Sequence, residues 1–415
     1  MKTNRRAFLG QLGFGLSALE LKSQNYLSEL PEESFWESIR SKFPLTDNRV
    51  YLNNGTFGPS PTPVLKAIKD SLDLTNITGK YGHTDKFRQA LANFVKVSDK
   101  EISLTHNTTE GINIVCWGLN LKQEDEVIIS LHEHVGNALP WINRAKLHGI
   151  KLIPFDPKPT AEENFDLLRS LITSKTKVIA IPHITCTTGQ VFPIKEISAL
   201  ARSKGTFTAI DGAHGTGTFD LDLKELGCDS YATSCHKWML GPNGTGFLYI
   251  REEHLDKIQA YQVGAYSDKG WDLYSNPPKI MGYNPSAHRF DYGSQSTPLY
   301  AGAAASATFH ETIGKKKIEN RLRDLSTYLY NGLSLFTDKL DILTPEEEKS
   351  RICMVTFKPK QQDYKAFSKK ASQAGFRIRV VPESRLDAIR ISTHVYNAKT
   401  QVEDFINFTK DTLYT

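Results

Sequence analysis

Short apolar runs alternate with amphipathic segments along most of this chain. Seven apolar runs have the length of buried strands: residues 101–105, 125–130, 151–155, 177–185, 206–211, 230–234 and 245–250. Between the earlier runs lie the helical patterns "TTEGINIVCWGL", "NALPWINRAKLHG", "NFDLLRSLIT" and "IKEISALARSKG". This alternation predicts an α/β fold with a mostly parallel seven-stranded sheet between helices. In such sheets the functional sites lie at the carboxyl ends of the strands.

The last part of the chain has a different pattern. A helical stretch from about residue 300 to 340 leads to the apolar runs "RICMVTF", "FRIRVV" and "AIRIS", which alternate with helices starting near Asp363 and Thr400. We therefore predict a large α/β domain over residues 31–300, which includes the N-terminal segment. Residues 301–415 are predicted to form a connecting helix and a smaller α+β domain. The Pro- and Gly-containing stretch 263–298 is interpreted as a long functional loop region.

Residues 1–30 resemble an export signal. Arg5 and Arg6 precede a modest apolar stretch, with Phe8 and Leu9 at the positions typical of a twin-arginine signal. This interpretation predicts export to the periplasm of a protein that folds, and acquires any cofactor, in the cytoplasm. The alternative is a basic chain start without function, which would leave the protein in the cytoplasm. No later segment has the length and apolarity that predict membrane insertion.

Composition excludes several classes of protein. The 51 Lys and Arg residues stand against 46 Asp and Glu, and a formal charge of +5 is too small to indicate nucleic-acid binding. The five cysteines are scattered without a CxxC pair, so they indicate neither a zinc site nor a disulfide framework. A chain of 415 residues with 39% hydrophobic residues is long enough for a large core and two domains.

Candidate chemistry lies where the predicted strands end. After "EISLTH", Asn107 is suited to cap a helix, Glu110 stands three residues on, and Thr108 and Thr109 lie in the first turn. The free backbone N–H groups and positive end of such a helix can bind a phosphate, although most capped helix starts bind nothing. This stretch alone is therefore a weak indication.

Two further strand ends carry titratable residues. His132, Glu133 and His134 follow "DEVIIS", but ligand partners at metal-site spacing are missing elsewhere, so a flat imidazole facing a ring is the better hypothesis. Asp211 ends the apolar run "TFTAI", where a carboxylate is costly unless a cation or a hydrogen-bond donor meets it. The alternative for Asp211 is a helix cap or a loop salt bridge.

Lys237 follows "SYATS" and precedes a glycine-rich turn. A lone lysine there usually extends along the strand end to water. A lysine amine in low-dielectric surroundings can instead lose its proton and form a Schiff base with an aldehyde cofactor. A phosphate cradle, a stacking ring, an acidic partner for a pyridine nitrogen and a lysine together match pyridoxal 5′-phosphate.

The order of four motifs, "NTTEGIN", "EHVGNALPW", "DGAHG" and "SCHKWMLGPNGTG", resembles the class V aminotransferase family of fold-type I pyridoxal-phosphate enzymes. The resemblance begins at "YLNNGTFGPSPTPVLKAI" (51–68) and ends at "RISTHVYNAKTQVEDFI" (390–406). The "NNGTFGPSP" and "DGAHG" stretches are most similar to the isopenicillin N epimerase-like branch.

The resemblance implies a role for each site residue. Lys237 would be the Schiff-base lysine and a general base, Asp211 the partner of the pyridine nitrogen, and His134 the stacked ring. Arg390 and Asn54 would contact the substrate, with Arg390 binding its carboxylate. The remaining cofactor contacts implied are the phosphate-binding Thr108, Thr109, Ser234 and His236, then His214 near the phenolic oxygen, and Ser294.

Departures from the family narrow the reaction. The stretch "RIRVVPESRLDAIRIS" lacks the nucleophilic cysteine of cysteine desulfurases, and Cys186 stands where desulfurase-like members usually have an asparagine. The segment "RFDYGSQSTP" resembles the one with which family members reach the neighbour's phosphate, so a homodimer is implied, although Ser294 replaces the usual threonine. Amino transfer and epimerisation of an amino acid or amine remain competing reactions, because they differ only in where the proton returns. A non-catalytic binding protein or a polyanion-binding module are the alternatives from other classes.

Overall fold

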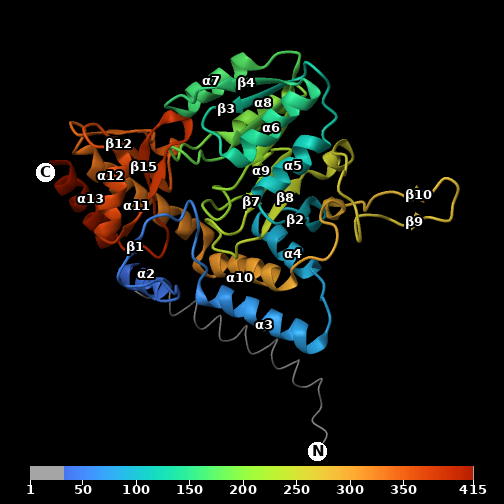
Figure 1. Cartoon of the computed structure of the whole chain (residues 1–415), viewed down its shortest axis with the longest axis horizontal. Helices are drawn as coiled ribbons and strands as arrows, with labels where there is room; N and C mark the ends of the chain where they lie inside the picture. Colours follow the sequence, from blue (N-terminus) through green and yellow to red (C-terminus); the bar gives the residue numbers. More distant parts are fainter. Residues whose placement is uncertain (1–31, 415) are drawn as a thin grey trace, which may run out of the picture.

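The computed structural model describes residues 32–414, so the predicted export signal lies outside the described residues (Figure 1). Its largest sheet has seven strands in the order β2-β8-β7-β6-β5-β3-β4. The strands are β2 (Ile102–Thr105), β3 (Glu126–Ser130), β4 (Lys151–Phe155), β5 (Thr176–Pro182), β6 (Phe207–Asp211), β7 (Ser230–Ser234) and β8 (Gly246–Ile250). Strand β8 runs opposite to the other six strands, so its pairings with β2 and β7 are antiparallel and the remaining pairings are parallel. The predicted mostly parallel sheet is confirmed.

Helices cover both faces of this sheet, and this explains the uniformly apolar strands. In β3, Val127 and Ile129 enter one hydrophobic cluster, whereas Ile128 enters the other. A strand buried on both faces needs apolar side chains at every position rather than at alternate ones. The first cluster includes residues of α5 (Thr108–Gly118) and α6 (Val135–His148), and the second includes residues of α7 (Ala161–Leu171) and α8 (Ile194–Ser203), with the short α9 (Leu223–Leu226) nearby.

The predicted long helical stretch is two helices, α10 (Thr297–Ile313) and α11 (Lys315–Ser334), which are separated at Gly314. Helix α10 packs against α3 (Thr62–Thr78) and α4 (Asp85–Phe94) beside the large sheet, whereas α11 packs against the C-terminal unit. That unit contains an antiparallel sheet in the order β11-β12-β15-β14, formed by β11 (Leu340–Ile342), β12 (Met354–Pro359), β15 (Ala388–Ser392) and β14 (Arg379–Val381). Helices α12 (Tyr364–Gln373) and α13 (Lys399–Tyr414) cover it.

The N-terminal segment pairs with the C-terminal unit, although the sequence pattern grouped it with the large domain. Strand β1 (Val50–Tyr51) lies parallel to β13 (Phe376–Arg377), after the first described helix α2 (Glu32–Arg40). From β1 the chain returns toward the large sheet, where the backbone N–H of Gly58 donates to the carbonyl of His236 at 2.7 Å. The segment 50–58 therefore links the C-terminal unit to the loop that carries Lys237.

The stretch 263–298 contains a hairpin of β9 (Trp271–Asp272) and β10 (Lys279–Ile280), which projects away from the body of the molecule (Figure 1). Large apolar side chains on and beside this hairpin are exposed, Trp271 and Tyr274 among them. Among the helices of the described chain, none combines the length and apolarity needed to cross a membrane.

Candidate active site

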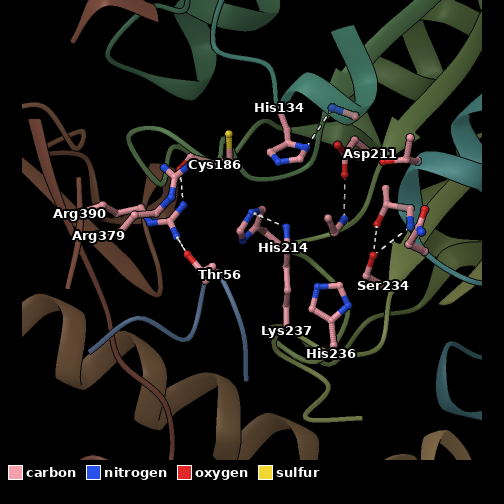
Figure 2. A pocket seen from close by; sticks show the side chains of 16 residues that line it. Thr56, His134, Cys186, Asp211, His214, Ser234, His236, Lys237, Arg379 and Arg390 are labelled. Atoms are coloured by element: carbon pink, nitrogen blue, oxygen red, sulfur yellow. Dashed lines mark hydrogen bonds between the residues drawn. The ribbon is translucent and has the colours of Figure 1, made fainter. Parts of the chain in front are cut away.

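A cavity of about 200 Å³ lies at the carboxyl ends of the parallel strands. The end of β6 contributes Asp211, the loop after β7 contributes Lys237, and the start of α6 contributes His134. Arg379 and Arg390 close it from the C-terminal sheet (Figure 2). The predicted strand-end residues thus meet at one place, as the parallel topology requires.

One end of the cavity is a cradle of donors. Asn107 caps α5 by accepting the Glu110 N–H at 3.0 Å, and the backbone N–H of Thr108 donates to the Ser234 hydroxyl at 2.9 Å. Thr108, Thr109, Ser234 and His236 all line this end. The Nδ1 atom of His236 is buried without a hydrogen-bond partner among the described residues. A helix start flanked by hydroxyl groups and by an unpartnered imidazole nitrogen is suited to an anion such as phosphate.

A second helix begins beside the first. His134 caps α6, because its Nδ1 accepts the backbone N–H of Gly136 at 3.0 Å. A Cβ atom on Gly136 would lie 2.3 Å from the Thr109 hydroxyl oxygen, so glycine is what allows the two helix starts to approach this closely. Burial, and then the charge of Lys237, lower the pKa of His134. The ring is therefore a neutral, flat surface in the cavity wall.

The neighbouring residues of His134 point elsewhere. His132 hydrogen-bonds with Thr187 at 3.2 Å, and Glu133 accepts from Asn137 within α6 at 2.9 Å. Across residues 32–414 no group of three or more His, Cys, Asp or Glu side chains is placed to hold a metal ion.

Asp211 and Lys237 lie deep in the cavity. Asp211 is 4% exposed, and its Oδ1 accepts the backbone N–H of Ala213 at 2.9 Å. The Lys237 amine lies 3.2 Å from Nε2 of His214, whose Nδ1 accepts the indole N–H of Trp238 at 2.9 Å. Burial lowers the pKa of Lys237 to about 8, and the negative charge of Asp211 opposes that change.

Arg390 lies in β15 and is 1% exposed. Its guanidinium donates to the Cys186 carbonyl at 2.5 Å and to the Thr56 hydroxyl at 3.1 Å, while its Nε is buried without a partner among the described residues. Burial, and then the neighbouring Arg379, lower the pKa of Arg390 to about 10. A buried cation of this kind has a strong tendency to bind an anion.

The sequence analysis missed two polar side chains of the cavity wall, Arg379 and Thr56. Arg379 stands directly opposite Arg390 in the β14/β15 pair and is ion-paired with Glu383. Thr56 reaches Arg390 from the N-terminal segment. The hydrophobic pattern identifies neither residue, because Arg379 depends on the β14/β15 register and Thr56 on the packing of the N-terminal segment against Arg390.

Asn54 does not line the cavity, in contrast to the prediction. Its Oδ1 accepts the Tyr396 hydroxyl at 3.0 Å, and it is fully buried against the C-terminal unit. The turn that follows the bridge between Asn53 and Ser392 presents Gly55 and Thr56 to the cavity instead. Ser294 is exposed and lies outside the cavity of this single chain.

The residues present fit pyridoxal 5′-phosphate. An anion cradle with the unpaired Nδ1 of His236, a neutral ring, a buried carboxylate and a buried amine of lowered pKa are the groups that this cofactor needs. The model of the family "Aminotransferase class-V" matches residues 73–405. The chain belongs to this family, whose cofactor is pyridoxal 5′-phosphate.

Known proteins similar to this chain have different activities. A probable cysteine desulfurase of Halalkalibacterium halodurans is 31% identical over 342 residues, 77% of this chain and 81% of the relative. Isopenicillin N epimerase of Streptomyces clavuligerus is 26% identical over 396 residues, 89% and 96% of the two chains. The solved structure of a C-DES lysine mutant, with glycine covalently linked to its PLP cofactor, has a TM-score of 0.81 at 27% identity and covers 89% of this chain and 98% of that one. The family of this chain is therefore shown, whereas its relatives within that family do not agree on the reaction.

Proposed function

We propose that this chain transfers the amino group of an amino acid or amine, with pyridoxal 5′-phosphate as cofactor. The observation that carries the proposal is the convergence of Lys237, Asp211 and Arg390 on one cavity. An amine, an anion and a carboxylate-binding cation are the three groups that reaction at an amino-acid α-carbon requires.

Residues at the two helix starts would hold the cofactor. The phosphate would bind the donors of Thr108, Thr109, Ser234 and His236, and the neutral ring of His134 would face the pyridine ring. Asp211, as an anion, would favour a proton on the pyridine nitrogen. When bound, the cofactor supplies an electron-withdrawing ring that makes the α-proton of an attached amino acid acidic.

Lys237 and Arg390 would act on the substrate from opposite ends. Arg390 is preorganised by the Cys186 carbonyl and the Thr56 hydroxyl, and its planar fork suits a carboxylate. The carboxylate would thus be fixed, and the α-proton directed toward the amine of Lys237. That amine has a pKa lowered to about 8 by burial, so a substantial fraction is neutral near physiological pH and can accept a proton.

Epimerisation is the second candidate, and Cys186 is the observation that favours it. Amino transfer needs one amine to move a proton from the α-carbon to the adjacent cofactor carbon, whereas epimerisation needs a second acid on the other face of the substrate. Cys186 and Lys237 both line the cavity, and Figure 2 shows them at separate positions in its wall, Cys186 beside the arginines and Lys237 beside His214. Burial raises the pKa of Cys186 to about 11, so the thiol keeps its proton and is an acid rather than a base.

The cysteines argue against desulfuration through a cysteine nucleophile. All five are buried, and burial raises the pKa of every thiol. A protonated, buried thiol is a poor nucleophile, since the thiolate is the reactive form. The loop between β14 and β15 has no cysteine.

One experiment distinguishes these reactions. The purified holoenzyme is incubated with each common amino acid in heavy water, and α-deuterium, keto acid, enantiomer ratio and sulfide are measured. Keto acid and pyridoxamine phosphate in equal amounts support amino transfer. Deuterium with racemisation and no keto acid overturns it in favour of epimerisation, and sulfide from cysteine overturns both. Absence of all four signals, in a protein with bound cofactor, would support a binding protein instead.

We also propose that the chain acts as a homodimer. The hairpin around Trp271 and Tyr274 and the α6 stripe of Val135, Leu139 and Ile142 are exposed and apolar, which is typical of a protein interface. Ser294 lies on the surface, where it is available to a second copy. Light scattering of the intact chain and of Trp271→Ser should give a dimer and a weakened dimer; a monomeric wild-type chain would contradict this proposal.

We further propose export through the twin-arginine route, on the strength of Arg5 and Arg6 in the sequence.

A further inference from the structure

Trp238, the residue after the active-site lysine, is held in place by three contacts. Its carbonyl accepts the Nε2–H of His394 at 3.0 Å and lies 3.0 Å from Nε2 of His310. Its indole ring stacks on His394 with a centroid distance of 5.7 Å and an interplanar angle of 24°. The side chain is fully buried. The direction of its indole N–H is therefore fixed by the surrounding core rather than by the cavity.

This N–H determines which nitrogen of His214 carries a proton. The indole Nε1 lies 2.9 Å from His214 Nδ1, and an indole N–H can only donate, so Nδ1 is an acceptor without a proton. Burial, and then the charge of Lys237, lower the pKa of His214 well below its usual value, so the ring is neutral. A neutral imidazole has one proton, which must be on Nε2.

The consequence reaches Lys237. Its amine nitrogen lies 3.2 Å from His214 Nε2. With a proton on Nε2, the imidazole is the donor and the lysine nitrogen must offer a lone pair. An ammonium group has no lone pair, so this hydrogen bond forms only with the neutral amine.

We propose that Trp238 is a positioning residue that favours the neutral amine of Lys237, because its indole N–H holds His214 as the tautomer that donates to that amine. This inference deepens the proposed function and rests on it, since the neutral amine is the form that attaches an aldehyde cofactor and accepts an α-proton. We call the two hydrogen bonds from Trp238 to His214 and from His214 to Lys237 the relay. Trp238 affects Lys237 only through His214 and does not itself touch the reacting atoms.

The His214 donor works together with other charges around Lys237. Seven charged or titratable groups interact electrostatically with Lys237, so that its pKa or theirs is changed. They are Asp211, Cys186, Arg390, Arg379, His134, His214 and His236. Asp211 favours the ammonium form, whereas Arg390 and Arg379 oppose it. The hydrogen bond from His214 adds to the effect of the arginines and of burial.

The test uses the cofactor-free chain, so it does not depend on turnover. Stopped-flow absorbance follows the capture of pyridoxal 5′-phosphate between pH 6 and 10, and the midpoint of the rate reports the pKa of Lys237. Trp238→Phe should raise this midpoint by about one unit, a tenfold fall in the neutral fraction below it, which is the scale of one net hydrogen bond. If the wild-type rate equals that of Lys237→Ala, the proposed function fails; an unchanged midpoint in Trp238→Phe overturns only the relay.

Two controls separate the relay from loss of packing. Trp141→Phe changes another fully buried tryptophan, whose N–H donates to Asn137 at 3.2 Å, and should leave the midpoint unchanged. In a His214→Gln background the amide donor does not depend on a tautomer, so Trp238→Phe should cause no further shift; an equal shift in both backgrounds overturns the relay. If Trp238→Phe does not fold, ¹⁵N-histidine NMR of the wild-type chain decides, because a proton on His214 Nδ1 overturns the proposal.

Discussion

Lys237→Met should stabilise the cofactor-free chain at neutral pH and lose that advantage as the pH rises. Lys237 is buried, and burial lowers its pKa from 10.5 to about 8. Between those two values the unfolded chain binds more protons than the folded one, so wild-type stability rises with pH across this window. Methionine has no proton to bind, and the variant lacks that rise.

The magnitude follows from the size of the pKa change. The difference between 10.5 and about 8, at 1.36 kcal/mol per pKa unit, is worth about 3 kcal/mol. The hydrogen bond from His214 forms only with the neutral amine, so its loss is part of this pH-dependent difference and adds no separate cost. The free-energy difference between variant and wild type should therefore change by about 3 kcal/mol in total, and most of the change should fall between pH 8 and 10.5.

Urea unfolding of both cofactor-free chains at pH 7, 8, 9, 10 and 10.5 measures this difference. Lys369→Met, at an exposed position of α12, reports the effect of removing any lysine from the surface. A difference between Lys237→Met and wild type that stays constant from pH 7 to 10.5 would refute the reasoning, because the folded-state pKa of Lys237 would then be unperturbed.

Three further outcomes follow from the site and the sequence. Arg390→Lys cannot bind a carboxylate through two parallel hydrogen bonds, so kcat/KM for the best amino acid should fall about ten- to a hundredfold, with cofactor absorbance unchanged. Gly58→Ala would place a Cβ atom 1.9 Å from the Lys237 carbonyl oxygen and should lower the free energy of unfolding by about 1–3 kcal/mol, whereas Gly264→Ala, whose added Cβ would meet its nearest atom at 3.5 Å, should have little effect in the same urea titration. Arg5→Lys with Arg6→Lys should retain the protein in the cytoplasmic fraction; unchanged periplasmic recovery would contradict twin-arginine export.

The large sheet was predictable from the sequence because burial on both faces leaves long apolar runs such as the one that becomes β5. The meeting of Thr108, Asp211 and Lys237 then followed from parallel topology, which collects the strand ends at one edge. The part of the cavity wall that the C-terminal unit contributes was not predictable in the same way. Arg379 faces Arg390 because of the β14/β15 register, whereas Asn54 is held by the Tyr396 hydroxyl beside the bridge between Asn53 and Ser392. The contact between Asn54 and Tyr396 joins residues 342 positions apart, and a local hydrophobic pattern carries no information about it. The β14/β15 pair is local, but its pattern does not tell that this sheet meets the strand ends of the large domain.

Lys237 and Arg390 belong to different units of the molecule, the first to the loop after β7 and the second to the C-terminal sheet. A ligand with both an amino group and a carboxylate at adjacent carbons can bridge these two units, whereas a simple amine can engage only one. Under the proposed function, a bound amino acid would therefore act as a cross-link between the two units of the molecule.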